Sequence, residues 1–121
     1  MRHVVLVGHG SRSAEANEAL VALAAGMARD LGEPVHPAFL EMTTPTIPET
    51  LHAALAAGAT TITVVPYFLS PGMHVRRDIV EVVDAVRAES GAAIEIAPFF
   101  GSHPEIPRLL AEMAGNRTVP A

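Results

Sequence analysis

The chain has 121 residues, half of them hydrophobic, and a formal net charge of −5, which fits one compact domain spanning residues 1–121. It has no cysteine, which excludes disulfides, iron–sulfur clusters and thiolate zinc sites and favours an intracellular setting. The acidic balance without a basic cluster argues against a nucleic-acid partner, and no apolar run reaches the roughly 20 residues of a membrane span, so we expect a cytoplasmic protein.

The first predicted element is a strand over residues 4–7, four apolar residues that suit burial on both faces of a sheet. It runs into Gly8-His9-Gly10, where the glycines allow a sharp turn and the close approach of a ligand. Ligands of open α/β sheets bind at the carboxyl ends of the strands, so His9 is the first candidate functional residue. A helical spacing of apolar residues follows over 16–31, and Gly32 can end that helix.

The second predicted strand, residues 35–40, contains Pro37, which cannot donate a ladder hydrogen bond and therefore indicates a sheet edge. Thr46-Ile47-Pro48-Glu49 is a capping box that predicts the start of a second helix, which closes near Gly58. Residues 61–67 are nearly all apolar or β-branched and predict a central third strand.

A loop over 68–74 leads into a third predicted helix over 74–89. The fourth strand, 93–97, carries Glu95 at its centre, which suits the opposite edge of the sheet. Ser102 and Glu105 have capping-box spacing and predict a last helix through Met113, and we expect the tail over 115–121 to be flexible.

Alternation of strand and helix four times predicts an α/β fold, a four-stranded parallel sheet with helices on both faces in a flavodoxin-like three-layer sandwich. Because the second and fourth strands carry edge features, the expected strand order is 2-1-3-4. Its switch point lies between the first and third strands, which are neighbours roughly 4.8 Å apart. The loops that carry His9 and His74 should therefore open into the same crevice.

Imidazole is a common ligand of divalent transition metals and titrates near neutrality, so one histidine can serve as metal ligand and as proton acceptor. Two histidine ligands leave coordination positions open, which suits a metal that is held briefly. We therefore hypothesise a transient metal site at His9 and His74. The alternatives are a structural role for His9 and a helix N-cap role for His74.

Two carboxylates are candidate supporting residues. Glu41 follows the second strand and can ligate a metal, take a proton or cap the next helix. Asp78 lies one helical turn after His74 and can orient its imidazole, or act as a solvated first-turn carboxylate. Arginines beside the two loops are candidates to pair with substrate carboxylates, with simple solvation as the alternative; they are Arg12, Arg76 and Arg77.

The other histidines are weaker candidates. His3 precedes the first strand and is expected to be solvated, His36 lies on an edge strand, and His52 lies off the apolar stripe of its helix. His103 follows the fourth strand on the crevice side, near its edge.

One motif follows each predicted strand: Gly-His9-Gly-Ser11-Arg12, then Phe-Leu-Glu41 with Pro45-Thr-Ile-Pro48, then Pro66-Tyr-Phe-Leu-x-x-Gly72-x-His74-x-x-x-Asp78-Ile79, and Gly101-x-His103-Pro104. In this order the four motifs resemble those of the small sirohydrochlorin chelatases of the CbiX type, in the class II chelatase superfamily. The resemblance covers almost the whole chain.

The resemblance implies insertion of a divalent metal into sirohydrochlorin, an octacarboxylate tetrapyrrole, in cobalamin or siroheme biosynthesis, without nucleotide hydrolysis and without a permanently bound cofactor. It implies Co²⁺ as the first choice of metal substrate, with Fe²⁺ or Ni²⁺ as alternatives. His9 and His74 would be the catalytic residues and metal ligands, with His9 also the proton acceptor. A non-catalytic, histidine-based metal-binding module remains the rival reading.

The resemblance also implies a substrate surface. Its residues would be Gly10, Ser11, Arg12, Thr44, Leu69, Ser70, Pro71, Gly72 and Met73. Many relatives carry an acid where this chain has Thr44, so no carboxylate contact is available at that position. Larger members of the superfamily enclose the tetrapyrrole between two such lobes, so we expect a homodimer that shares its cleft between subunits.

Overall fold

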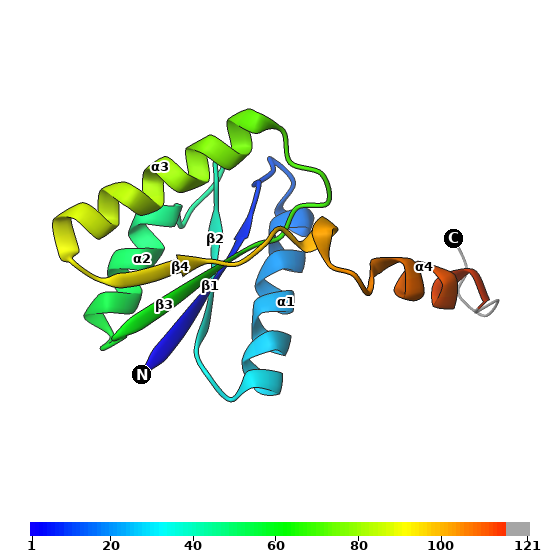
Figure 1. Ribbon diagram of the computed structural model, residues 1–121, viewed down its shortest axis with the longest axis horizontal. Helices are drawn as coiled ribbons and strands as arrows, with labels where there is room; N and C mark the ends of the chain where they lie inside the picture. The colour runs from blue at the N-terminus through cyan, green and yellow to red at the C-terminus, as the bar shows by residue number, and fades with distance from the viewer. Residues whose placement is uncertain (116–121) are drawn as a thin grey trace.

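Four parallel strands in the order β2-β1-β3-β4 form the centre of the structure, a computed structural model that describes residues 1–115 (Figure 1). The strands are β1 (Arg2–Gly8), β2 (Val35–Phe39), β3 (Thr61–Pro66) and β4 (Ala93–Ile96). The predicted order is confirmed, as are the edge positions of the strands that contain Pro37 and Glu95.

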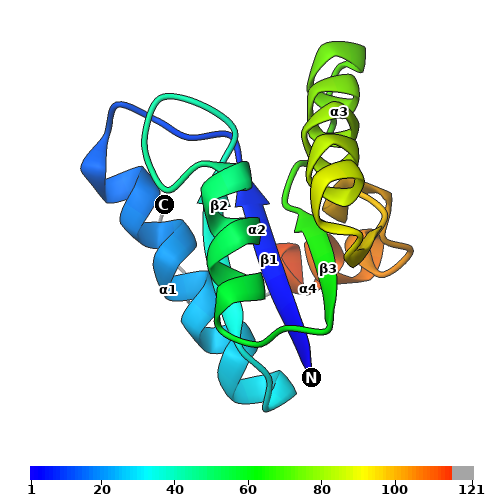
Figure 2. The same ribbon diagram turned by 90° about the vertical axis from the view of Figure 1, so that its left-hand side faces the viewer.

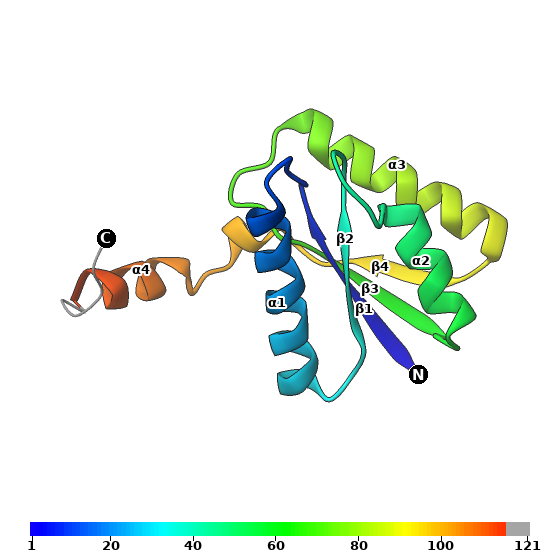
Figure 3. The ribbon, with the colours of Figure 1, turned by 180° about the vertical axis from the view of Figure 1, so that it is seen from behind.

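Helices cover both faces of the sheet. They are α1 (Ala14–Leu31), α2 (Ile47–Ala56), α3 (Met73–Ser90) and α4 (Ile106–Gly115), with a short 3-10 turn η1 (Phe100–Ser102) before α4. Figures 1 and 3 show α1 on one side of the strands, and α2 with α3 on the other. The α4 helix extends away from the sheet, and Figure 2, which looks from the opposite end of the molecule, shows it behind the strands.

Alternate residues of β1 divide the core into two parts. Val5 and Val7 join the larger cluster under α2 and α3, whereas Leu6 packs with Leu20 of α1 on the other face. Residues 3–8 are all buried, which is the pattern expected of a strand covered on both faces. The predicted capping box at the start of α2 is present, with Thr46 and Glu49 bonded to each other's backbone N–H.

Two expectations are wrong. The last helix begins at Ile106 and not at the predicted Ser102 cap, because the Ser102 hydroxyl donates to the Phe99 carbonyl and the Glu105 N–H donates to His103 Nδ1. His3 is buried rather than solvated, since it lies on the same face of β1 as Val5 and Val7.

The tail predicted to be flexible lies, beyond Gly115, outside the described residues. Within residues 1–115, none of the helices combines the length and apolarity that a bilayer-crossing segment requires.

Candidate active site at the carboxyl ends of the strands

The turn after β1 brings His9 against Glu41. Leu40 N–H donates to the Gly8 carbonyl at 2.9 Å and Glu41 N–H donates to the His9 carbonyl at 3.0 Å, so the backbone pairing of β1 and β2 continues past the strands. The side chains follow the backbone: His9 Nε2 lies 2.8 Å from Glu41 Oε1, and both side chains are about half exposed. The structure thus pairs the two side chains in solvent at the carboxyl ends of β1 and β2.

This contact determines what the imidazole can do. When Nε2 carries the proton that bonds to the carboxylate, Nδ1 keeps a free lone pair. A carboxylate behind an imidazole fixes the tautomer and the orientation of the ring. The His9–Glu41 pair can therefore hold a cation or accept a proton at the exposed side of the ring.

Gly10 makes the close approach of the two loops possible. Its φ is +98°, and a Cβ at this position would lie 1.8 Å from the Glu41 carbonyl oxygen, so no other residue fits without moving the loop. The Asn17 side chain accepts from the Ser11 N–H and donates to the Ser11 carbonyl, which ties the other end of the turn to α1.

The loop after β3 lies beside this pair. The ring of Phe68 is 6.4 Å from the ring of His9, centroid to centroid, and 6.2 Å from the ring of Phe99 in an edge contact. The guanidinium of Arg76 lies 4.8 Å above the Phe99 ring and donates to the Pro71 carbonyl at 3.4 Å. These contacts hold the segment that leads to His74.

His74 lies in the first turn of α3 and is paired with an arginine. Arg77 Nη2 lies 3.0 Å from His74 Nδ1, and because a guanidinium can only donate, the imidazole nitrogen is the acceptor. Gly72 is the N-cap of α3, so His74 does not cap the helix. The supporting role of Asp78 stays a prediction.

The topology places the His9 and His74 loops after the neighbouring strands β1 and β3, as expected. Within residues 1–115, however, no three His, Cys, Asp or Glu side chains lie close enough together to hold a metal ion. His9 and Glu41 are therefore brought together, whereas a shared metal site with His74 stays a prediction.

Large apolar side chains are exposed in the segments that follow β2 and β3. Leu69 is 73% and Met73 81% exposed, both in the segment predicted to bind a substrate, and Met42 is 52% exposed directly after Glu41. A groove of about 410 Å³ lies between the turn after β1 and α1, and its lining includes Gly10, Ser11 and Tyr67. The sequence analysis missed Met42 and Tyr67, although each directly adjoins a predicted site segment. Contacts of these residues with a substrate stay predictions.

Comparison with known proteins gives consistent matches. The CbiX family model matches residues 3–116. A sirohydrochlorin cobaltochelatase of Methanocaldococcus jannaschii is 45% identical over 80 residues, which are 65% of this chain and 56% of that protein.

Two solved structures superpose with a TM-score of 0.84. The CbiX protein from Marinobacter aquaeolei VT8, described as a putative cobalamin (vitamin B12) biosynthesis protein, is 27% identical and matches over 94% of both chains. SirB from Bacillus subtilis, with Fe³⁺, is 29% identical and matches over 98% of this chain but 48% of its own. The chain thus spans about half of SirB and less than two thirds of the cobaltochelatase.

Proposed function

The chain belongs to the CbiX family, and on that premise we propose that it is a sirohydrochlorin chelatase, which inserts a divalent metal into the tetrapyrrole without nucleotide hydrolysis. The observation that carries the proposal is the His9–Glu41 pair, 2.8 Å apart at the open carboxyl edge of the sheet. We propose Co²⁺ as the metal substrate because the similar M. jannaschii protein is named a cobaltochelatase. Fe²⁺ is the first alternative, since the SirB structure holds iron.

Metal insertion makes two demands on a site. The cation must exchange its water ligands for ring nitrogens, and two pyrrole N–H protons must leave. The free Nδ1 lone pair of His9 suits a weakly held cation or an arriving proton, and Glu41 stabilises the charge that the ring then carries. His74 would supply a second nitrogen ligand from the neighbouring loop.

The surroundings of the pair suit a flat macrocycle with acidic substituents. The exposed side chains of Met42, Leu69 and Met73 offer an apolar surface that has no covering in the described chain. Exposed arginines in the two loops are candidates to pair with substrate carboxylates; they are Arg12 and Arg76, and Arg76 would have to leave its contacts with Phe99 and Pro71.

We further propose a homodimer in the cytoplasm. SirB matches nearly all of this chain and has about as much chain again beyond the match, so a second copy would take the place of that remainder. Sedimentation velocity at micromolar concentration tests the dimer, and a monomer there would contradict it.

A non-catalytic metal carrier is the second candidate. It is favoured by the small number of potential ligands that meet at the site, since His9 contacts Glu41 and no third His, Cys, Asp or Glu of the described chain joins them. A carrier binds Co²⁺ stoichiometrically and does not accelerate insertion.

The deciding experiment follows the absorption spectrum of sirohydrochlorin with Co²⁺, Fe²⁺ or Ni²⁺ and a substoichiometric amount of protein. We expect multiple turnovers with the wild type and none above background with His9→Ala or His74→Ala. His52→Ala is the matched control, because His52 is also half exposed and also bonded to a carboxylate, that of Glu89. Insertion by His9→Ala at the wild-type rate, with all variants folded by circular dichroism, would refute the assignment.

A further inference from the structure

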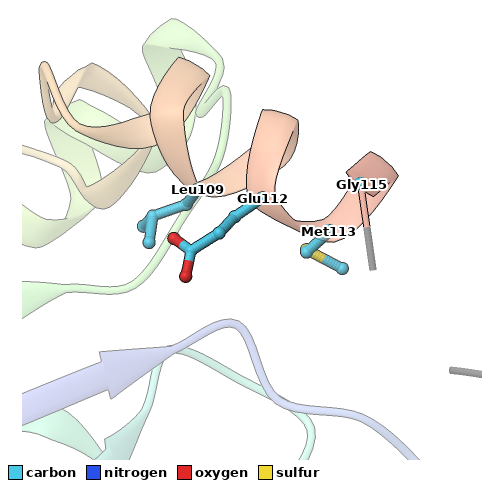
Figure 4. Close-up of a pocket in the computed structure, with 4 residues that line it drawn as sticks. All are labelled: Leu109, Glu112, Met113 and Gly115. Carbon is cyan, nitrogen blue, oxygen red and sulfur yellow. The ribbon is translucent and has the colours of Figure 1, made fainter. Parts of the chain in front are cut away.

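The α4 helix has an apolar stripe that no other described element covers. Ile106, Leu109, Leu110 and Met113 recur at helical spacing, and within the described chain α4 has no buried residue. Figure 4 shows Leu109 and Met113 extending from the same side of the helix, in a pocket whose described lining comes from α4 alone. A ten-residue helix is marginal on its own in water, so α4 requires a surface to pack on.

On the α1 side of the sheet, the half formed by β3 and β4, here called the β3–β4 half-face, is not covered by any described helix. Ile62 and Val64 of β3 are fully buried under α3, whereas their neighbours Thr61, Thr63 and Val65, which point to the other face, are exposed or half-buried. On that other face α1 packs on β2 and β1. Among the described helices, none takes the equivalent position over β3 and β4.

The upper end of this half-face is a groove. Its volume is about 370 Å³, and its lining includes Val65, Ala97, Phe100 and Pro104. Apolar side chains dominate it, as they do the stripe on α4. The chain therefore carries two complementary apolar surfaces that do not meet.

Backbone contacts at η1 direct α4 away from the β3–β4 half-face of the same chain. Gly101 N–H donates to the Phe68 carbonyl at 2.9 Å, and a Cβ on Gly101 would lie 1.6 Å from the Leu69 carbonyl oxygen, so η1 is clamped against the loop after β3. The three residues from η1 to α4 span at most about 10 Å. Ile106 N–H is bonded back to the His103 carbonyl at 3.1 Å, which fixes the start of the helix. Folding α4 back onto its own sheet would break these contacts.

We propose that α4 is an exchanged arm, whose stripe packs on the β3–β4 half-face of a second copy while that copy returns its own α4 around a two-fold axis. A second copy is the fitting occupant because one chain presents both surfaces, which is the requirement for a self-complementary interface. The SirB match also includes α4, since it covers 98% of this chain, and polypeptide continues beyond the match in that protein. The inference rests on the proposed homodimer and adds the surface that forms it.

The first test is the oligomeric state. We expect the wild type to sediment as a dimer and Leu110→Glu to weaken the dimer at least tenfold, because a carboxylate would enter the apolar contact. Ala111→Glu adds the same charge on the opposite side of α4 and should leave the dimer intact. Equal behaviour of the two variants would overturn the proposal, as would a monomeric wild type.

The second test uses the absence of cysteine from the natural sequence. A Leu110→Cys chain is mixed with a Val65→Cys chain and oxidised, and we expect a covalent heterodimer. The control mixture, Arg108→Cys with Val65→Cys, places the thiol on the polar side of α4 and should give little covalent heterodimer.

Two results would contradict the exchange of α4 between copies without contradicting the proposed function. A dimer that gives no Leu110–Val65 cross-link contradicts the exchange but not the dimer. A cross-link within single chains of a Leu110→Cys/Val65→Cys double variant shows that each α4 covers its own sheet. Metal insertion measured on the same wild-type sample tests the proposed function separately.

Discussion

At the scale of single residues, Arg77 controls the availability of His74. Its hydrogen bond occupies the Nδ1 lone pair, which leaves the ring proton of a neutral imidazole on Nε2. A cation that binds His74 must displace the arginine or that proton, and the guanidinium charge repels it as well. Under the proposed function, Arg77 would therefore compete with the metal for His74.

We therefore expect Arg77→Ala to bind Co²⁺ more tightly. An exposed, charge-assisted hydrogen bond contributes about 1 kcal/mol, which corresponds to roughly a fivefold change in dissociation constant. Isothermal titration with Co²⁺ alone measures the change, and Arg29→Ala, which removes an equal charge from the far end of α1, should have no such effect. Unchanged or weaker binding by Arg77→Ala would contradict the competition.

A second residue-scale feature is the contact between His3, which is buried, and His36, which is half-buried. His3 Nδ1 lies 2.9 Å from His36 Nε2, and the two ring planes are within 18° of each other, so a single proton is shared between them. Burial, followed by the charge of His3, lowers the pKa of His36 below its ordinary value of 6.5. In the described part of the chain His3 Nε2 has no partner, which adds to the cost of placing charge there.

The pH dependence of stability follows from this shift. The unfolded chain binds a proton on His36 at a higher pH than the folded chain does, so stability is full above pH 6.5 and falls as the pH drops below that value. We expect the melting temperature of the wild type to fall more between pH 7.5 and 5.5 than that of His36→Gln. His52→Gln, which replaces an exposed histidine, should behave like the wild type. An equal fall in melting temperature for all three proteins would contradict the role assigned to the His3–His36 pair.

At the scale of elements, the turn after β1 depends on glycine. Gly10→Ala should destabilise the fold by about 1–3 kcal/mol and abolish insertion, because the added Cβ collides with the Glu41 backbone and separates the pair. Gly26→Ala is the matched control, since Gly26 lies within α1, outside the proposed site, and the added atom would meet nothing closer than 3.7 Å. Chemical denaturation and the insertion assay measure both effects; comparable losses in the two variants would contradict the steric argument.

The elements that were predicted correctly are those whose signals are local. Pro37 and Glu95 marked the edge strands, and the apolar run over 61–67 marked a central one. The start of α4 was missed because Ser102 and Glu105 have the spacing of a capping box but bond elsewhere, to the Phe99 carbonyl and to His103. A spacing rule does not reveal which partner a side chain takes in the folded chain.

At the scale of the whole molecule, strand order was enough to predict that the His9 and His74 loops follow neighbouring strands. The same order predicted that Glu41 also lies at the carboxyl ends of the strands, but it did not predict the contact of Glu41 with His9. The sequence could not show that His74 is paired with Arg77, because a rotamer of an exposed side chain depends on neighbours in space. It also gave no sign that α4 extends outward, since an amphipathic pattern does not say whose surface the helix covers.

The contact between Gly101 and the Leu69 carbonyl joins two parts of the molecule that would otherwise be independent. Leu69 lies in the segment expected to receive the tetrapyrrole, whereas Gly101 sets the direction in which α4 leaves. Because the Gly101 N–H is also bonded to the Phe68 carbonyl, movement of the Leu69 backbone toward Gly101 would displace the backbone there. Cleft occupancy and subunit association would then be thermodynamically linked, and a ligand that strengthens association would itself be held more firmly by the associated form, by the same factor.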